Sequence, residues 1–503
     1  TANAYDDGDD PIDILVESGH LIEPGDGALS GGLAYEGLNN AGSSGEPLIV
    51  ILNDNGMSID GNVGAVSEHL GLLRSKPAYY EFKKAYRDLL DRNAVGRAVY
   101  DFNHHLKTNV KKALLPNSTM FEDMGFTYLG PVNGHDVGQL TNTLKWAKDL
   151  NCPVLVHVHT KKGKGYPPAE REPERYHGVG KFDPRMGVSR EHKRDFSAVF
   201  GDELCKLAKN DETICTITAA MRDGTGLHDF SEQYPVRFFD VGIAEGHAVA
   251  MAAGMAKQGL TPVVAIYSSF LQRAYDELWH DLCLNDVPAT ILVFGASIFG
   301  TTSETHLSFF DISMLGALPN MRYLAPSCME EYLSMLSWSL DHREHPVAIR
   351  VPGIGLVSRP DLAPAEDTDY SAVRYNVVRQ GRDVAVLALG DFFELGERVA
   401  NRLAVEYGIE ATLVNPRFAT ELDREFLDSL AAEHRVVVTL EDGILDGGWG
   451  ERVACYLACT PVRTRTFGIA KGFPDRYDPN ELLAQNGMTV ENMAAEAVRL
   501  LNE

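Results

Sequence analysis

The stretch that decides the fold runs from Gly25 to Asn55 and reads GDGALSGGLAYEGLNNAGSSGEPLIVILNDN. Its first acidic residue, Asp26, lies between two glycines, which take positive φ readily and allow a ligand to approach the backbone closely. The apolar run Leu48–Leu52 has the length and branching of a strand that is buried on both faces of a parallel sheet. Asn55 therefore falls just beyond the carboxyl end of that strand, at the edge where open α/β sheets bind ligands.

Asp26 and Asn55 together predict a metal site. A carboxylate and an amide oxygen are hard ligands, which Mg²⁺ prefers when it also holds the diphosphate of a substrate or cofactor. A Gly-Asp-Gly sequence by itself is common, and an ordinary turn between a strand and a helix is the competing interpretation. The asparagine at the end of a buried strand favours the metal site.

The length and the net charge of the chain limit the partners that it can bind. The chain has 503 residues, enough for about three domains that each bury a core. Lys and Arg number 46 against 71 for Asp and Glu, which gives a formal net charge of −25. Nucleic acids and anionic membranes both require basic surfaces, so the charge argues against either partner. We expect small-molecule substrates.

The cysteines and the apolar runs indicate a cytoplasmic protein. No run approaches the roughly 18 apolar residues of a membrane span, and the acidic beginning of the chain does not resemble a signal peptide. None of the seven cysteines has C-x-x-C spacing, so we expect reduced, buried thiols rather than disulfides or a metal cluster. The cysteines are Cys152, Cys205, Cys215, Cys283, Cys328, Cys455 and Cys459.

Strand and helix patterns alternate along most of the chain, which predicts an α/β fold built on parallel or mixed sheets. No clear strand leads into Gly25, and Lys76–Leu115 has the apolar spacing of helices. Two segments rich in Pro and charge, Pro167–Arg185 and Pro360–Asp369, divide the chain into three domains. The expected strands are 48–52, 154–159, 213–218, 237–241, 263–267, 289–294, 347–351, 383–389, 411–414 and 436–440, and the expected helices include 33–41, 196–209, 245–257, 393–407 and 490–501.

Several motifs resemble those of the 1-deoxy-D-xylulose-5-phosphate synthases, a family of transketolase-like enzymes that use thiamin diphosphate. Gly-Asp-Gly followed by Asn about thirty residues later is the thiamin diphosphate motif. The stretches FEDMGFTYLGPVNGHD (Phe121–Asp136) and VLVHVHTKKGKGYPPAE (Val154–Glu170) follow the family nearly residue for residue. Asn415–Phe418 and Gly447–Gly450 are similar to the carboxy-terminal domain of the same enzymes. The resemblance covers the chain from Gly25 to its end.

The resemblance implies a fold, a reaction and two cofactors. The expected domains are a diphosphate-binding domain (1–187) that lacks the family's usual N-terminal part, a pyrimidine-binding domain (188–358) and a transketolase-type C-terminal domain (366–503). The expected reaction decarboxylates pyruvate and transfers the two-carbon unit to glyceraldehyde 3-phosphate, for isoprenoid, thiamin and pyridoxal synthesis. Thiamin diphosphate, Mg²⁺ and a homodimer are implied as well.

The resemblance also assigns the cofactor contacts. Asp26 and Asn55 are implied as the Mg²⁺ ligands. The other implied contacts to thiamin diphosphate are Gly27, Ala28, Met57, Tyr166, Glu245 and Phe270. Tyr166 ends a basic loop, Lys161–Tyr166, that is suited to lie near an anion, although a solvated turn explains its composition equally well.

Glu245 is the candidate acid that activates the cofactor. Thiamin diphosphate reacts at C2 of its thiazolium ring, and the protein must supply a carboxylic acid to the aminopyrimidine ring. A glutamate in the first turn of a helix is usually only a favourable partner for the helix dipole. The segment Asp240–Val249 (DVGIAEGHAV), however, resembles the family motif that carries the activating glutamate, with Gly246 where the family has Gln.

Four residues match family positions beside the pyrimidine ring of the cofactor or near the substrate. Phe270 is expected to stack on the pyrimidine ring. Tyr267 and Arg273 lie in the same matching stretch, which implies an arginine near the substrate. His306 of Thr305-His306 matches a histidine that positions substrate and moves protons, tasks that suit an imidazole because its pKa lies near neutrality.

The acceptor side of the expected site departs from the family. The Asp and Gly that shortly precede Thr-His are here Thr302 and Ser303, and Ser308 replaces a glycine. Gly295 and Gly353 stand where the family has two arginines that belong to the site of the acceptor's phosphate. Arg273 and Arg350 remain as candidates to offset that loss.

These departures leave two alternatives beside the ordinary synthase. One is a paralogue that performs the same carboligation on an unphosphorylated or differently charged acceptor. The other is a degenerate homologue that acts as a partner subunit, because the family's Gly-Gly-His and Gly-His-Ser segments normally precede Gly25. His157 and His159 show no third ligand, so we interpret them as core or surface histidines.

Overall fold

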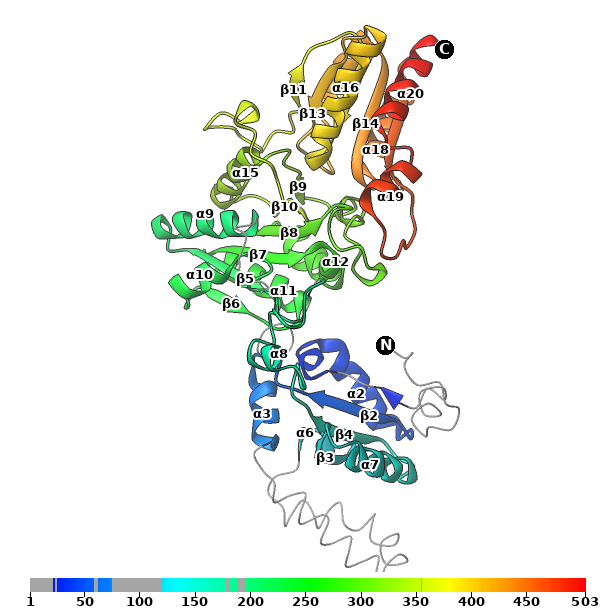
Figure 1. The fold of residues 1–503 in the computed structure, drawn as a ribbon. Coiled ribbons are helices and arrows are strands. Elements are labelled where there is room, and N and C mark those ends of the chain that lie inside the picture. The colour runs from blue at the N-terminus through cyan, green and yellow to red at the C-terminus, as the bar shows by residue number, and fades with distance from the viewer. Residues whose placement is uncertain are drawn as a thin grey trace, which may run out of the picture. The chain divides into compact units, whose positions relative to one another are not determined.

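A computed structural model describes residues 21–22, 25–57, 62–74, 119–177, 179, 181–188, 196–353 and 355–503 (Figure 1). The helices expected within Lys76–Leu115 lie outside these residues. The chain divides into two compact units, one of residues 1–190 with Val241–Ala244, the other of residues 191–240 with 245–503. Among the described residues, no helix has the length and apolar character needed to cross a membrane.

The first unit contains a four-stranded sheet in the order β1-β2-β4-β3, and all of its pairings are parallel. Residues from β2 enter two separate core clusters: Val50 and Leu52 pack with Leu38 of α2, and Ile49 packs with Leu144 of α7. The sheet is therefore buried on both faces, as the apolar run predicted. Its strands are β1 (Leu21–Ile22), β2 (Ile49–Asp54), β3 (Thr127–Asn133) and β4 (Val154–His159), and its helices are η1 (Asp26–Ser30), α2 (Gly32–Ser44), α3 (Ala65–Arg74), α6 (Met120–Asp123), α7 (Val137–Asp149) and α8 (Pro167–Arg171).

A strand does lead toward Gly25, contrary to our expectation. Leu21 and Ile22 of β1 pair in parallel with Ile49 and Val50, and Gly25 bridges to Asn53 in the same register. This strand was not predicted because it is only two residues long, too short to leave a pattern in the sequence. The backbone of Asp26 therefore follows directly on the residue that pairs with Asn53.

The second unit begins with a six-stranded sheet in the order β6-β5-β7-β8-β10-β9, again with only parallel pairings. Helix α11 (Glu245–Lys257) follows β6 along the chain and packs on β7. The strands are β5 (Ile214–Thr218), β6 (Phe238–Asp240), β7 (Thr261–Tyr267), β8 (Thr290–Ala296), β9 (Arg322–Leu324) and β10 (Val347–Pro352). The other helical segments are α9 (Phe196–Asn210), α10 (His228–Gln233), α12 (Ser268–Leu271), η2 (Gln272–Ala274), α13 (Tyr275–Glu277), η3 (Leu278–Cys283), η4 (Glu304–His306), α14 (Asp311–Leu315) and α15 (Met329–Asp341).

The third sheet is mixed, with the order β11-β13-β12-β14-β15. The edge strand β11 pairs antiparallel with β13, and the other pairings are parallel. Its strands are β11 (Asn376–Arg379), β12 (Asp383–Ala388), β13 (Thr412–Asn415), β14 (His434–Ile444) and β15 (Arg463–Ile469). Its helical segments are η5 (Pro360–Leu362), η6 (Gly390–Phe392), α16 (Phe393–Tyr407), α17 (Arg424–Glu433), α18 (Trp449–Leu457), α19 (Pro479–Gln485) and α20 (Val490–Asn502).

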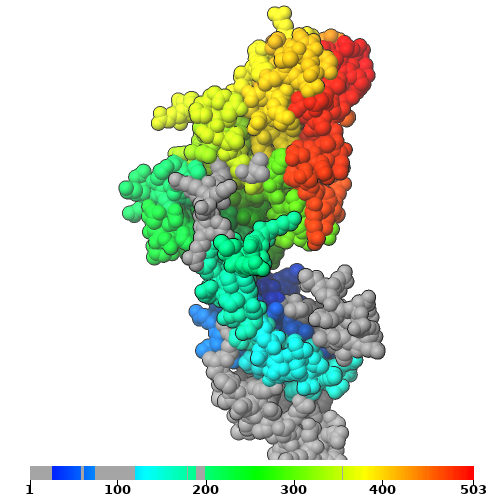
Figure 2. Space-filling model, viewed as in Figure 1, coloured from blue at the N-terminus to red at the C-terminus, as the bar shows by residue number. Residues whose placement is uncertain are grey.

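The second and third sheets share one hydrophobic core. Ile298 and Phe309 from the second region lie in the same buried cluster as Val386, Leu440 and Phe467 from the third. Figure 2 shows the two regions, green and yellow to red, directly adjoining each other. The alternation of strands and helices confirms the predicted α/β class. The exact domain limits that we placed at 187, 188, 358 and 366 stay a prediction.

Candidate active site

In the first unit, the end of β2 brings Asp26 and Asn55 to one edge of the sheet. The Gly25–Asn53 bridge is parallel, so the residues that follow each partner advance along the same edge. Asn55 is the first residue after β2, as predicted, and is half-buried. Of the neighbouring candidates, Gly27 is buried, Ala28 is exposed and Met57 is half-buried.

Two hydrogen bonds hold the turn that carries Asn55. The backbone N–H of Met57 donates to Asn55 Oδ1 over 2.9 Å, and the N–H of Gly56 donates to Asp54 Oδ1 over 3.2 Å. An amide oxygen has two lone pairs, so Asn55 Oδ1 keeps one for a further ligand. The hydrogen bond thus orients the Asn55 side chain, and its oxygen can still accept a second ligand.

The chemistry of this donor set fits a magnesium diphosphate. Among the described residues, no group of three or more His, Cys, Asp or Glu side chains is arranged to hold a metal ion. A hard cation at Asp26 and Asn55 would need further oxygens from its ligand, which is how Mg²⁺ is usually held beside a diphosphate.

One lysine of the basic loop before Tyr166 is paired with a carboxylate. Lys161 Nζ donates to Glu170 Oε2 over 2.6 Å, and this bond, with a second from the N–H of Gly165, lowers the pKa of Glu170 to about 2. The Tyr166 hydroxyl donates to the carbonyl of Pro184 over 2.8 Å, and its ring lies edge-on to Tyr176. Contact of Tyr166 with a cofactor stays a prediction.

In the second unit, Glu245 is the first residue of α11 and its side chain is only 3% exposed. Burial raises the pKa of the Glu245 carboxyl, while the charge of Arg273 acts in the opposite direction. Arg273 Nη1 donates to Glu245 Oε2 over 2.5 Å. A buried carboxyl with a raised pKa keeps its proton at higher pH, which is what a proton donor requires.

Gly246 has a structural explanation. A Cβ built at this position would lie 2.6 Å from Oε1 of Glu277, so the space beside the helix start is occupied by that carboxylate. The glycine therefore accommodates Glu277, and a larger residue would have to displace the end of this flexible side chain. The departure from the family pattern at Gly246 leaves the position of Glu245 on α11 unchanged.

Three more of the predicted residues form one aromatic group. The rings of Tyr267 and Phe270 are stacked with centroids 6.1 Å apart, and His306 meets Phe270 edge-on at 5.3 Å. Thr305 Oγ1 lies 2.7 Å from Nδ1 of His306, and the Tyr267 hydroxyl donates to the carbonyl of Gly224. The structure therefore brings together Tyr267, Phe270 and His306, and separately Glu245 and Arg273.

Comparisons with known proteins identify the family of this chain. Residues 20–160 match the model of the family described as 1-deoxy-D-xylulose-5-phosphate synthase, and residues 192–355 and 374–493 match the pyrimidine-binding and C-terminal domains of transketolase. The 1-deoxy-D-xylulose-5-phosphate synthase of Clostridium perfringens (strain 13 / Type A) is 42% identical over 95% of this chain and 77% of its own length. The chain belongs to the 1-deoxy-D-xylulose-5-phosphate synthase family. It is a transketolase-like transferase that depends on thiamin diphosphate.

Further relatives are synthases of the same family or solved transketolases. The synthases of Desulforudis audaxviator and Pelotomaculum thermopropionicum are 43% and 44% identical, over 94% and 93% of this chain and 75% and 74% of their own lengths. A solved split-gene transketolase, an inactive beta4 tetramer, covers 61% of this chain and 97% of its own at 27% identity and a TM-score of 0.54. The transketolase of Campylobacter jejuni, at 18% identity and a TM-score of 0.50, covers 95% of this chain and 77% of its own and shows the shared fold.

The predicted acceptor side lacks room for one of the two arginines expected there. A Cβ at Gly353 would lie 2.4 Å from the Cα of Gly300, a backbone atom that has no flexible end to move. Gly295 has φ +64, and a Cβ there would meet nothing closer than the ring of Tyr267 at 4.0 Å. A side chain thus fits at Gly295 with backbone strain, whereas none fits at Gly353 without a shift.

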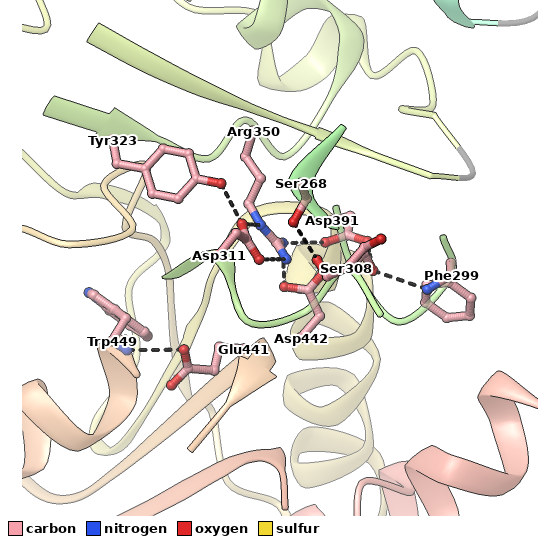
Figure 3. Close-up of polar contacts among 11 residues, drawn as sticks. Ser268, Phe299, Ser308, Asp311, Tyr323, Arg350, Asp391, Glu441, Asp442 and Trp449 are labelled. Atoms are coloured by element: carbon pink, nitrogen blue, oxygen red, sulfur yellow. Dashed lines mark hydrogen bonds and ion pairs between the residues drawn. The ribbon is translucent and has the colours of Figure 1, made fainter. Parts of the chain in front are cut away.

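Arg350 does not offset this loss, contrary to one of our expectations. The side chain is 1% exposed, and its guanidinium donates to Asp311 through Nε (2.7 Å) and Nη2 (3.2 Å) and to Asp442 through Nη1. Figure 3 shows the guanidinium enclosed by these carboxylates, with Asp391 on a further side. Arg350 connects β10 to α14 and β14. Its guanidinium is paired with carboxylates of the protein and is not available to a substrate phosphate.

Sequence reasoning missed the acidic partners of Arg350. Asp391 Oδ1 lies 3.6 Å from Arg350 Nη1, and its Oδ2 accepts from the hydroxyl of Ser297. Burial and the neighbouring charge of Asp442 raise the pKa of Asp391 well above its usual range. The separations in sequence, 39 residues to Asp311 and 92 to Asp442, left no local signal.

Proposed function

We propose that this chain decarboxylates pyruvate and transfers the two-carbon unit to a short aldehyde, the reaction expected of a 1-deoxy-D-xylulose-5-phosphate synthase. The observation that carries the proposal is the buried Glu245 carboxyl at the start of α11, held by Arg273. An acid so placed has a raised pKa and a fixed direction. Family membership supplies the rest of the assignment.

We further propose that Asp26 and Asn55 hold Mg²⁺ and, through it, the diphosphate of the cofactor. Bound thiamin diphosphate supplies a nucleophilic carbon for the cleavage and formation of bonds next to a carbonyl. Asn55 would contribute the free lone pair of its oriented amide oxygen, and Asp26 its carboxylate charge. Gly27, Ala28, Met57 and Tyr166 are proposed as further contacts to the cofactor.

Glu245 is proposed to donate a proton to the pyrimidine ring of the cofactor, and Phe270 to support that ring by stacking. Glu245 is buried, so its proton is shielded from water and its position varies little. Arg273 limits the rise in the pKa of Glu245, which favours release of the proton to the ring.

His306 is proposed to position the substrate and to move a proton during carboligation, with Tyr267 in the same aromatic group. The imidazole is half-buried, with one nitrogen, Nδ1, next to the Thr305 hydroxyl and its ring edge-on to Phe270. Nε2 is then the nitrogen that remains for exchange with a substrate oxygen.

A second candidate concerns the acceptor: a short aldehyde without a phosphate. Three observations favour it. Gly353 has no room for a side chain, Gly295 carries none, and Arg350 is enclosed by carboxylates. Arg273 is the remaining arginine of our predicted set, and one of its guanidinium nitrogens, Nη1, already donates to Glu245. A phosphate dianion would find fewer forks of the kind that bind it with two parallel hydrogen bonds.

The experiment for the proposed reaction is product analysis by NMR. The full chain is incubated with thiamin diphosphate, Mg²⁺, ¹³C-labelled pyruvate and a panel of phosphorylated and unphosphorylated aldehydes. We expect labelled CO2 and a 1-deoxyketose, and we expect neither from Glu245→Gln. Loss of label from pyruvate without any ketose would contradict the carboligase assignment.

Two further proposals rest on family membership alone. We propose a homodimer, which light scattering coupled to size-exclusion chromatography tests directly. We also propose a cytoplasmic location, which cell fractionation tests.

A further inference from the structure

A chain of hydrogen bonds crosses three strands of the first sheet and ends at the turn of Asn55. The Tyr128 hydroxyl of β3 lies 2.6 Å from His157 Nδ1 of β4, and His157 Nε2 lies 2.8 Å from Asp54 Oδ2 of β2. All three side chains are buried, with exposures of 1%, 0% and 0%. The function assigned above uses none of them.

The direction of these hydrogen bonds follows from the groups themselves. A carboxylate only accepts, so Nε2 of His157 carries the proton that it shares with Asp54. In the tautomer with its proton on Nε2, Nδ1 accepts and the Tyr128 hydroxyl donates to it. Both contacts of the His157 ring then join one donor to one acceptor. The second oxygen of Asp54, Oδ1, accepts from the N–H of Gly56.

These hydrogen bonds constrain the residues on either side of Asn55, the proposed metal ligand. Gly56 has φ +76, a conformation that glycine adopts without strain. Thr160 adds two contacts from the end of β4: its N–H donates to the carbonyl of Asp54 over 2.9 Å, and its hydroxyl donates to Asn53 Oδ1 over 2.7 Å. The residues on both sides of Asn55 are therefore fixed from the neighbouring strand.

Stability alone gives little reason for such a network in the core. Buried polar and charged groups carry a desolvation penalty, and apolar residues of similar volume often give an equally stable or more stable protein. The rest of this sheet follows that rule, because Leu52, Leu155 and Val156 form apolar cores on its two faces. A role in fixing a functional turn accounts for the exception.

We propose that Tyr128, His157 and Asp54 are positioning residues for the magnesium ligand Asn55. The proposal rests on the metal site proposed above. His157 orients the Asp54 carboxylate, this carboxylate holds Gly56, and the turn then directs Asn55 Oδ1 toward the cation. Tyr128 fixes the ring of His157 in the tautomer that makes this possible.

The test measures metal affinity rather than turnover. Mn²⁺, which is visible by electron paramagnetic resonance, replaces Mg²⁺ in titrations of the full-length chain at saturating thiamin diphosphate. We expect His157→Leu to weaken Mn²⁺ binding by about 10–100-fold, the usual effect of removing a partner of a metal ligand. Tyr128→Phe removes one hydrogen bond, so we expect a loss of about fivefold. Excess Mg²⁺ should restore cofactor binding in both variants.

The matched control is His434→Leu. His434 is also buried and bonds through both ring nitrogens, to Thr412 Oγ1 and to the carbonyl of Leu430, but it lies in the third sheet. This variant should lose thermal stability and keep its Mn²⁺ affinity. Folded His157→Leu with Mn²⁺ affinity within about twofold of the parent would overturn the proposal, and if that variant does not fold, the same result for Tyr128→Phe would do so.

A separate variant distinguishes this proposal from the metal site on which it rests. Asn55→Ala should abolish Mn²⁺ binding. Unchanged affinity in Asn55→Ala would remove the metal site itself, and with it the positioning role. Lost affinity in Asn55→Ala together with normal affinity in both His157→Leu and Tyr128→Phe would reject only the positioning role.

Discussion

Arg273 Nη1 and Glu245 Oε2 are 2.5 Å apart, and they join the proposed cofactor acid to an arginine that is still 43% exposed. Two opposing effects therefore act on the pKa of the Glu245 carboxyl. Burial raises the pKa of Glu245, and Arg273 lowers it. The exposed position of Arg273 lets it contact solvent or substrate while the acid stays enclosed.

Removal of the arginine should shift the pH profile of cofactor activation. In Arg273→Met the opposing charge is gone, so the pKa of Glu245 should rise further and its acid form should persist to higher pH. The decline in C2 proton exchange of bound thiamin diphosphate, measured by NMR across pH 6–9, should then occur at higher pH than in the parent. An unchanged profile would show that the two groups are not coupled in function.

Replacement of the acid should separate binding from activation. Glu245→Gln keeps the shape of the side chain but has no acidic proton to transfer to the pyrimidine ring. Calorimetry should show nearly normal cofactor binding, while C2 proton exchange should fall by about 10²–10⁴-fold, the usual contribution of general acid–base assistance. Normal exchange in this variant would remove Glu245 from the mechanism.

Loss of the proposed metal ligand should abolish cofactor binding rather than slow turnover. Asp26→Ala removes the carboxylate that neutralises the cation, so calorimetry with thiamin diphosphate and Mg²⁺ should show no binding. Asp136→Ala is the control, since Asp136 caps α7 in the same unit and accepts from the N–H of Gln139. That variant should lose about 1 kcal/mol of stability and bind the cofactor normally. Equal binding by both variants would restore the interpretation of Gly-Asp-Gly as an ordinary turn.

Much of this arrangement could be predicted from sequence because its signals are local. The apolar run 48–52 placed Asn55 at the end of a strand, and the glutamate after Gly242 lay at the start of a helix, as observed. The interpretation of Arg350 was wrong because the acids that enclose it come from α14 and β14. The histidines were interpreted correctly, since His157 is buried and His159 is exposed, but the partners of His157 lie on other strands. Long-range contacts of this kind leave no periodic pattern.

The acidic cluster around Arg350 should make the second unit less stable as pH rises. A carboxyl whose pKa is raised on folding stabilises the protein below its unfolded pKa, and this contribution is lost as pH rises through the folded value. Asp391 is such a group. Asp391→Asn should therefore come closest to the parent in Tm near pH 4, about the pKa of an unfolded aspartate, and exceed it at pH 8 by a few degrees. About 1 kcal/mol shifts Tm by roughly 2–4 °C in a domain of 150–250 residues.

The control for this prediction is Asp311→Asn. It breaks the paired hydrogen bonds to Arg350 and leaves a buried charge with fewer partners, so it should destabilise by about 3–5 kcal/mol at both pH values. A Tm difference between Asp391→Asn and the parent that does not change with pH would contradict the assignment of a retained proton to Asp391.

Arginine at position 295 should partly restore use of a phosphorylated acceptor. Gly295→Arg has space beside Tyr267, and its left-handed backbone costs about 1–2 kcal/mol. One charged hydrogen bond contributes roughly 1.5–3 kcal/mol, so kcat/KM for glyceraldehyde 3-phosphate should rise by about 10–150-fold. Gly295→Ala has the same strain without the charge and should show no rise. Gly353→Arg should fail to fold, because its Cβ would collide with the backbone of Gly300.

The most direct test of the account compares two acceptors with the unmodified chain. The measurement is kcat/KM for glyceraldehyde and for glyceraldehyde 3-phosphate, with pyruvate as donor and saturating thiamin diphosphate and Mg²⁺. The loss of two arginine contacts would reduce use of the phosphate by about a hundred- to ten-thousand-fold, so we expect the two acceptors to fall within about tenfold of each other. A preference of about a thousandfold or more for glyceraldehyde 3-phosphate would contradict the altered acceptor site and leave the ordinary synthase.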